Sequence, residues 1–172
     1  MRIGNAVMGP FPKRLLFTMI KTADFIGSLY SNPYVLRHYN ISDFSLFVNG
    51  KHVPSDGLSL AMYHEKTSVI GYRTLFEGTG IYHSNSGLRI KHDMYINVYL
   101  MLLFDLTPDR GASMGHTSPP ENGNIWIEVK FNKPLPEALT CLQYLEYDNS
   151  VPLEILRYVT TDFNMDTMQI LF

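Results

Sequence analysis

Apolar and polar residues alternate along several short segments of this chain, and turn-forming residues separate these segments. The clearest alternation runs over residues 124–131, where apolar side chains at 125, 127, 129 and 131 share one face and Trp126 lies on the other. Successive side chains of a β-strand point to opposite faces of the sheet, so this pattern predicts a half-buried strand.

Seven further segments have the composition of strands: residues 14–21, 34–39, 44–48, 51–54, 99–106, 138–147 and 158–163. Residues 99–106 are almost continuously apolar, as in a strand that is buried on both faces. Short strands that recur between turn signals favour an all-β sandwich or barrel. We therefore expect an all-β fold of about eight strands, with the jelly-roll β-sandwich as its specific form.

Asn49-Gly50 separates two of these strands and is the strongest hairpin signal in the chain. Both central residues of a type I′ turn need a positive φ, which Asn and Gly tolerate. Pro54 lacks a backbone N–H, so we expect the pairing to end there.

One or two short helices are expected beside the strands. Over residues 68–76 apolar side chains recur every three to four positions, and Gly78 follows as a stop signal. We expect this helix to lie over the sandwich. Residues 93–97 predict another helical turn with Asp93 as its N-cap.

The chain of 172 residues fits one domain, which we assign to residues 1–172. Residues 107–123 are rich in Gly, Ser and Pro and predict a long, exposed and mobile loop. Charged residues make up only 17% of the chain and hydrophobic residues 45%. With so little charge, part of the surface is expected to be covered by a partner.

The net charge of −2 argues against a large phosphate-binding face, so we expect no direct binding to nucleic acid. Lys13, Arg14 and Lys21 form the only local basic group, interpreted as solvated strand ends. No apolar run reaches the roughly 20 residues of a membrane-spanning helix. No secretory signal is recognisable either, so we expect an intracellular protein that is not secreted and does not bind membranes.

Candidate metal ligands and nucleophiles are present but poorly spaced. The six histidines are His38, His52, His64, His83, His92 and His116. None forms a close pair of metal-ligand spacing, although a site assembled from His83 and His92 is conceivable. The single cysteine, Cys141, excludes an intrachain disulfide and is expected to be a small core residue.

Three other features resemble functional sites. Asp105 and Asp109 could serve acid–base chemistry or bind Ca²⁺, but turn formation explains them more simply. Gly78-Thr79-Gly80 lacks the third glycine of a dinucleotide-binding loop and fits a helix stop followed by a turn. Trp126 could stack on a sugar, anchor an interface or pack beneath a neighbouring segment. We therefore expect no catalytic, cofactor or metal site and interpret the chain as non-enzymatic.

A series of short motifs occurs in a characteristic order. They are FPKR at 11–14, DFIGS at 24–28, NPY at 32–34, HYN at 38–40, FVNGKHVPS at 47–55, LFEGTGI at 75–81, FDLTPD at 104–109, LPE at 135–137 and YLEYDN at 144–149. In this order the chain resembles the C-terminal part of the major capsid-like proteins of Maverick/Polinton elements and their adintovirus-like relatives.

The resemblance implies the second jelly roll of a double jelly-roll, hexon-like capsid protein. Such a protein is structural, has no cofactor, and associates with itself and with other capsid proteins as a homotrimer that forms a pseudo-hexamer. It would be located in the virion if the element encodes it. The family's first jelly roll is missing, which suggests a truncated or transposon-derived copy, a domesticated remnant or a separate domain.

Two other functions stay open from the residues alone. One is a lectin-like binding module that uses Trp126 or the loop at 107–123. The other is a metal-dependent jelly-roll enzyme of the cupin type, whose expected histidine pair on one strand is absent.

Overall fold

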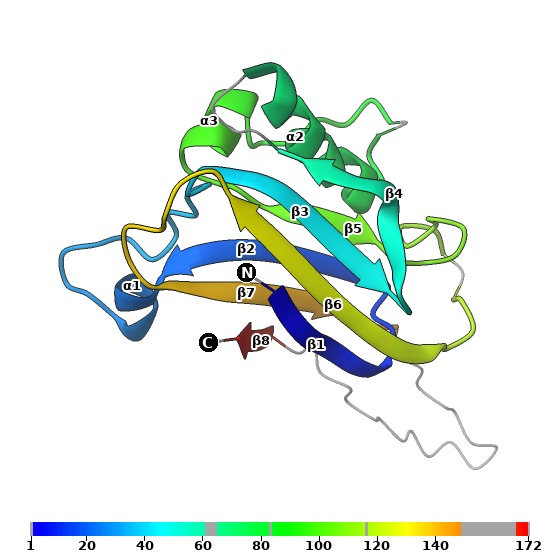
Figure 1. The fold of residues 1–172 in the computed structure, drawn as a ribbon. Helices are drawn as coiled ribbons and strands as arrows, with labels where there is room; N and C mark the ends of the chain where they lie inside the picture. The colour runs from blue at the N-terminus through cyan, green and yellow to red at the C-terminus, as the bar shows by residue number, and fades with distance from the viewer. Residues whose placement is uncertain (1, 61–64, 83, 116, 149–167, 172) are drawn as a thin grey trace, which may run out of the picture.

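The computed structural model describes residues 2–60, 65–82, 84–115, 117–148 and 168–171. Two four-stranded antiparallel sheets form a β-sandwich, with the helices of residues 65–79 and 92–97 over one edge (Figure 1). The first sheet has the order β1-β6-β3-β4 and the second the order β5-β2-β7-β8. The expected all-β class and sandwich are confirmed at this level.

The strands of the first sheet are β1 (Arg2–Pro10), β3 (Ile41–Val48), β4 (Lys51–Ser59) and β6 (Asn122–Phe131). Those of the second are β2 (Arg14–Lys21), β5 (Leu102–Asp105), β7 (Leu139–Glu146) and β8 (Met168–Leu171). The helices are α1 (Thr22–Ile26), α2 (Glu65–Thr79) and α3 (His92–Asn97). The described residues thus contain one helix more than the two expected.

The core lies between the two sheets, and aromatic rings from both sheets contact each other there. Phe44 of β3 lies 4.9 Å from Phe17 of β2 and 5.4 Å from Phe104 of β5, measured between ring centroids. Phe17 and Phe44 are fully buried. Ile125, Ile127 and Val129 of β6 are buried as their alternation predicted, because one face of the strand packs on this core.

The hairpin at Asn49-Gly50 is confirmed. Asn49 has φ +49° and Gly50 φ +78°, the two positive values that a type I′ turn requires. The expectation that Pro54 ends the pairing is wrong. The register shifts after Leu46 pairs with Val53, and pairing resumes at Leu58, so β4 bulges around the proline and continues to Ser59.

The helix expected over residues 68–76 is confirmed as the middle of α2, which packs against β5. It passes through Gly78, where an added Cβ would lie 2.5 Å from the Leu103 side chain of β5. The chain leaves the helix at Gly80, whose φ is +74°. Asp93 was wrongly predicted as an N-cap: α3 begins after Lys91, and Asp93 lies in its first turn.

Three predicted strands differ from the structure. Residues 34–39 form only an isolated bridge, Leu36 with Tyr99, because the chain turns at Tyr39 and Asn40 with positive φ. The strand expected at 99–106 is shorter, since only Leu102–Asp105 pairs, and it lies at the edge of its sheet. The strand expected at 158–163 lies outside the described residues.

Candidate functional site

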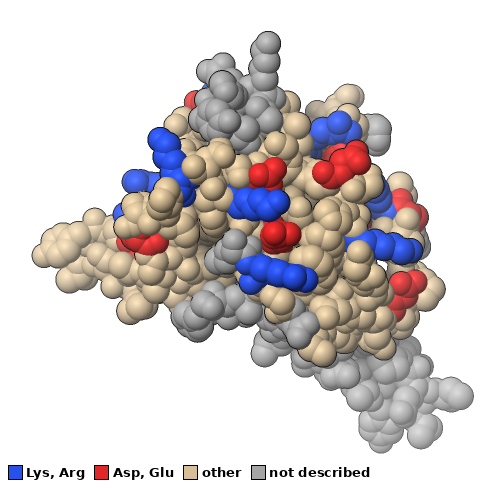
Figure 2. Space-filling view, in the orientation of Figure 1, with Lys and Arg blue, Asp and Glu red and all other residues tan. Residues whose placement is uncertain are grey.

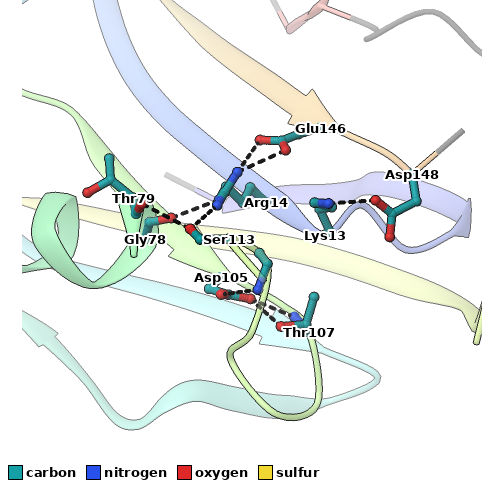
Figure 3. Close-up of polar contacts among 10 residues, drawn as sticks. Lys13, Arg14, Gly78, Thr79, Asp105, Thr107, Ser113, Glu146 and Asp148 are labelled. Carbon is teal, nitrogen blue, oxygen red and sulfur yellow. Dashed lines mark hydrogen bonds and ion pairs between the residues drawn. The ribbon is translucent and has the colours of Figure 1, made fainter. Parts of the chain in front are cut away.

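Arg14, from the predicted basic group, is the centre of a polar network at the start of β2 (Figure 3). Its Nη1 donates to both carboxylate oxygens of Glu146 on β7, at 2.9 and 2.8 Å. Its Nε donates to the Gly78 carbonyl at 2.8 Å, and its Nη2 donates to the Ser113 hydroxyl. One guanidinium therefore ties together two strands, the end of α2 and the loop after β5.

The two other cations of the basic group are also paired with carboxylates. Lys13 Nζ lies 2.5 Å from Asp148, and Lys21 Nζ lies 3.0 Å from Glu137. Each of these positive charges is thus partly neutralised by a carboxylate that lies just beyond one end of β7. This arrangement suits the joining of strands better than the capture of phosphate, which needs unpaired cations.

Asp105 and Asp109 shape the loop that follows β5. Asp105 accepts hydrogen bonds from the Thr107 N–H (3.0 Å), the Thr107 hydroxyl (2.6 Å) and the Ala112 N–H (3.0 Å). Asp109 accepts one from the Gly111 N–H at 3.1 Å. The interpretation of both carboxylates as turn-forming is confirmed. The loop is largely exposed, but these bonds hold Gly111 and Ala112 in buried positions.

Three histidines lie in local packing contacts. His38 Nδ1 accepts the Asn40 backbone N–H at 3.0 Å, and burial lowers the pKa of His38 below its usual value. His92 Nε2 lies 3.1 Å from the Ser68 hydroxyl. The ring of His52 stands edge-on to Phe47, with 3.9 Å between centroids.

His64, His83 and His116 lie outside the described residues, and so the conceivable His83–His92 site stays a hypothesis. Within the described ranges no three His, Cys, Asp or Glu side chains lie close enough to hold a metal ion. The absence of cofactor and catalytic residues likewise stays a prediction.

Cys141 is buried in β7, as predicted. Burial raises the pKa of its thiol to about 11, so the reactive thiolate is scarce at neutral pH. This cysteine therefore behaves as a small core residue.

Trp126 lies on the outer face of the first sheet in a row of aromatic contacts. Its ring stacks on Phe47 of β3, with 3.5 Å between centroids and 3° between planes. The Arg2 guanidinium lies 4.1 Å from the ring centroid. Of the three roles that the sequence leaves open for Trp126, packing among neighbours fits this geometry best, because these contacts leave little of the ring for a sugar.

Among the described residues, one exposed apolar segment was missed as a site. The chain between α1 and residue 36 projects from the sandwich, beside α1 in Figure 1. Leu29 and Tyr30 are 96% and 99% exposed, and Ile26 and Tyr34 are 77% and 75% exposed. We call residues 26–34 the apolar loop. Residues 25–36 contain no charged side chain, but this pattern does not distinguish an exposed segment from a buried one.

A hollow beside the apolar loop is lined by groups of both charges, among them Lys21, Asp24 and Arg37. Lys21 there is already paired with Glu137. Because the hollow is lined by both positive and negative groups, its electrostatic potential does not favour a ligand of either charge.

Comparison of the chain with protein-family models, with curated proteins and with solved structures found no match. In the described part of the chain, no helix is long and apolar enough to cross a membrane.

Proposed function

We propose that this chain is a structural, capsid-type domain that acts by self-association. The observation that carries the proposal is the apolar loop: a β-sandwich presents large apolar side chains to solvent on an uncharged projection. An exposed apolar surface of several hundred Å² is often a site that a partner covers.

The proposed form of the sandwich is a jelly roll, and the strand pairing supports it in part. A jelly roll is a long antiparallel hairpin rolled into two sheets, so its nested strand pairs alternate between them. Here β2 pairs with β7 in one sheet and β3 with β6 in the other. The pattern departs from an ideal jelly roll elsewhere, since β1 pairs with β6 and β4 with β3.

The proposed origin is the second jelly roll of a Maverick/Polinton-type major capsid protein. Its support is the order of motifs, several of which stand at structurally defined places. Asn49-Gly50 makes the β3–β4 turn, and FDLTPD at 104–109 closes β5 and begins the loop fixed by Asp105. In that family such domains assemble as trimers and pseudo-hexamers within the virion.

Size-exclusion chromatography with light scattering, over a wide concentration series of the whole chain, tests the proposal. We expect a mass that rises above the monomer as the concentration increases. A monomer at every concentration would overturn self-association.

The lectin-like module is the alternative, and it would use the half-buried Trp126, although the contacts of its ring with Phe47 and Arg2 argue against it. A glycan array that compares the native chain with Trp126→Ala decides between them. Binding that is lost in the variant would favour the lectin, whereas no binding to any sugar would remove it.

A further inference from the structure

The apolar loop is held in a defined shape by its own hydrogen bonds. The Tyr30 N–H donates to the Ser28 hydroxyl at 3.2 Å, and the Tyr34 N–H donates to the Asn32 side chain at 2.9 Å. The Val35 N–H donates to the Asn32 carbonyl at 3.3 Å. A loop that is already ordered loses less conformational entropy when it is buried by a partner.

Both ends of the loop are fixed to the sandwich. Before it, α1 follows β2 directly. After it, the Leu36 N–H donates to the Val98 carbonyl at 2.7 Å, and the Leu100 N–H donates to the Leu36 carbonyl at 2.8 Å. The exposed side chains are therefore presented on a supported projection.

The size of the exposed surface fits a protein interface. With roughly 200 Å² for an exposed tyrosine and somewhat less for leucine and isoleucine, the four side chains offer on the order of 600 Å². A specific interface buries about 800 Å² on each partner, and the largest apolar patch of a typical monomer is about 300–600 Å². The loop thus supplies most of one half of a standard interface.

The lack of charge indicates which partner fits. In Figure 2 the tip of the projection carries neither blue nor red atoms, and the nearest charged residues along the chain are Asp24 and Arg37. Nucleic acid or an acidic peptide would need cations there, and a basic peptide would need carboxylates. Across a two-fold axis the same patch of each copy meets itself, so a patch without charge brings no like charges together.

We infer that the apolar loop is the contact through which one copy of this chain packs against the same loop of a second copy about a two-fold axis. The inference rests on the proposed self-association and names its surface. It also specifies the geometry of the contact, in which the copies associate in pairs through the same surface.

The first test removes the apolar tip. In Leu29→Ser/Tyr30→Ser we expect the oligomer measured by light scattering to fall to half the native mass, and the dissociation constant of that step to rise at least about tenfold. Met114→Ser is the matched control, because Met114 is an exposed apolar residue outside the loop and 66% exposed. It should keep the native mass, and circular dichroism should show all three proteins equally folded.

The outcomes separate the inference from the proposed function. A monomeric native chain overturns both. A native oligomer whose mass the double variant leaves unchanged overturns the inference alone, and so does a fall from a trimer directly to a monomer, because the contact would not be two-fold.

Cross-linking tests the two-fold geometry directly. The only native cysteine, Cys141, is buried, so Leu29→Cys would place a single reactive thiol at the tip. We expect mild oxidation to give a covalent dimer on a non-reducing gel, and Met114→Cys to give none. Equal cross-linking of both variants, or of neither, would contradict the contact.

Discussion

The interior around Phe17 and the tip of the apolar loop contain the same kinds of side chain in opposite environments. Phe17 is fully buried between the sheets and packs on Phe44, whereas Leu29 and Tyr30 are almost fully exposed. Burial of apolar area drives both folding and association. The difference indicates that the two regions have different roles. The interior stabilises the fold, and the loop is available to bind a partner. Substitutions in the two regions should therefore affect different measurements.

The largest expected effect is in the interior. Phe17→Ala should lower the free energy of unfolding by about 3–5 kcal/mol, because it removes a buried ring and leaves a cavity beside Phe44. Urea denaturation measures the loss. Phe17→Leu, which keeps most of the volume, should cost clearly less. A loss below about 1 kcal/mol for the alanine variant would mean that the two sheets do not depend on this contact.

A smaller loss of stability is expected when the hydrogen bonds of Arg14, at the edge of the interior, are removed. Arg14→Met should cost about 2 kcal/mol, because the partly buried Glu146 carboxylate and the Gly78 carbonyl lose a charged donor. Lys13→Met is the matched control: Lys13 precedes Arg14 and makes a single ion pair with Asp148, so its loss should cost about 0.5 kcal/mol. Equal losses in thermal denaturation would show that the network around Arg14 adds nothing to an ordinary surface pair.

The sequence predicted the interior much better than the surface. Residues 124–131 and Asn49-Gly50 were predicted correctly, because side-chain alternation and turn φ angles are local properties. The strand β1 was missed, because Gly4, Gly9 and Pro10 dilute its pattern. A register shift between Ile3 and Val7 also leaves Ala6 and Val7 adjacent and both buried.

The apolar loop was missed for a different reason. Leu29 and Tyr30 have the same character as core residues, and only tertiary structure decides whether such a side chain is buried. Residues 34–39 show the same limit. Tyr34, Val35 and Leu36 suit a strand, yet within the described residues their β pairing is limited to the bridge between Leu36 and Tyr99. Tertiary context overrode local propensity at both places.

A still smaller effect is expected at His38, where the chain leaves the loop region for β3. Burial lowers the pKa of folded His38 below the unfolded value of 6.5, and its Nδ1 must stay unprotonated to accept the Asn40 N–H. The unfolded chain therefore binds the proton more readily, so the stability present above pH 6.5 is lost as the pH falls below it. Thermal denaturation between pH 8 and pH 5 should show this decline.

His38→Asn is the matched variant for this pH dependence. The asparagine oxygen can accept the same backbone N–H but does not titrate. The variant should therefore lose less stability than the native chain on acidification. Identical pH profiles for both proteins would show that another group causes the decline.

The smallest expected effect on stability is at the loop tip, and it sharpens the comparison most. Leu29→Ser/Tyr30→Ser should change the free energy of unfolding by no more than about 0.5 kcal/mol, since nearly all of both side chains is already in solvent. Urea denaturation must be done at a dilution where the native chain is monomeric, because association would itself stabilise the fold. At higher concentration the native chain should gain stability and the double variant should not. A large loss of unfolding free energy in the dilute double variant would show that the apolar loop stabilises the fold. The loop and the interior would then have the same role.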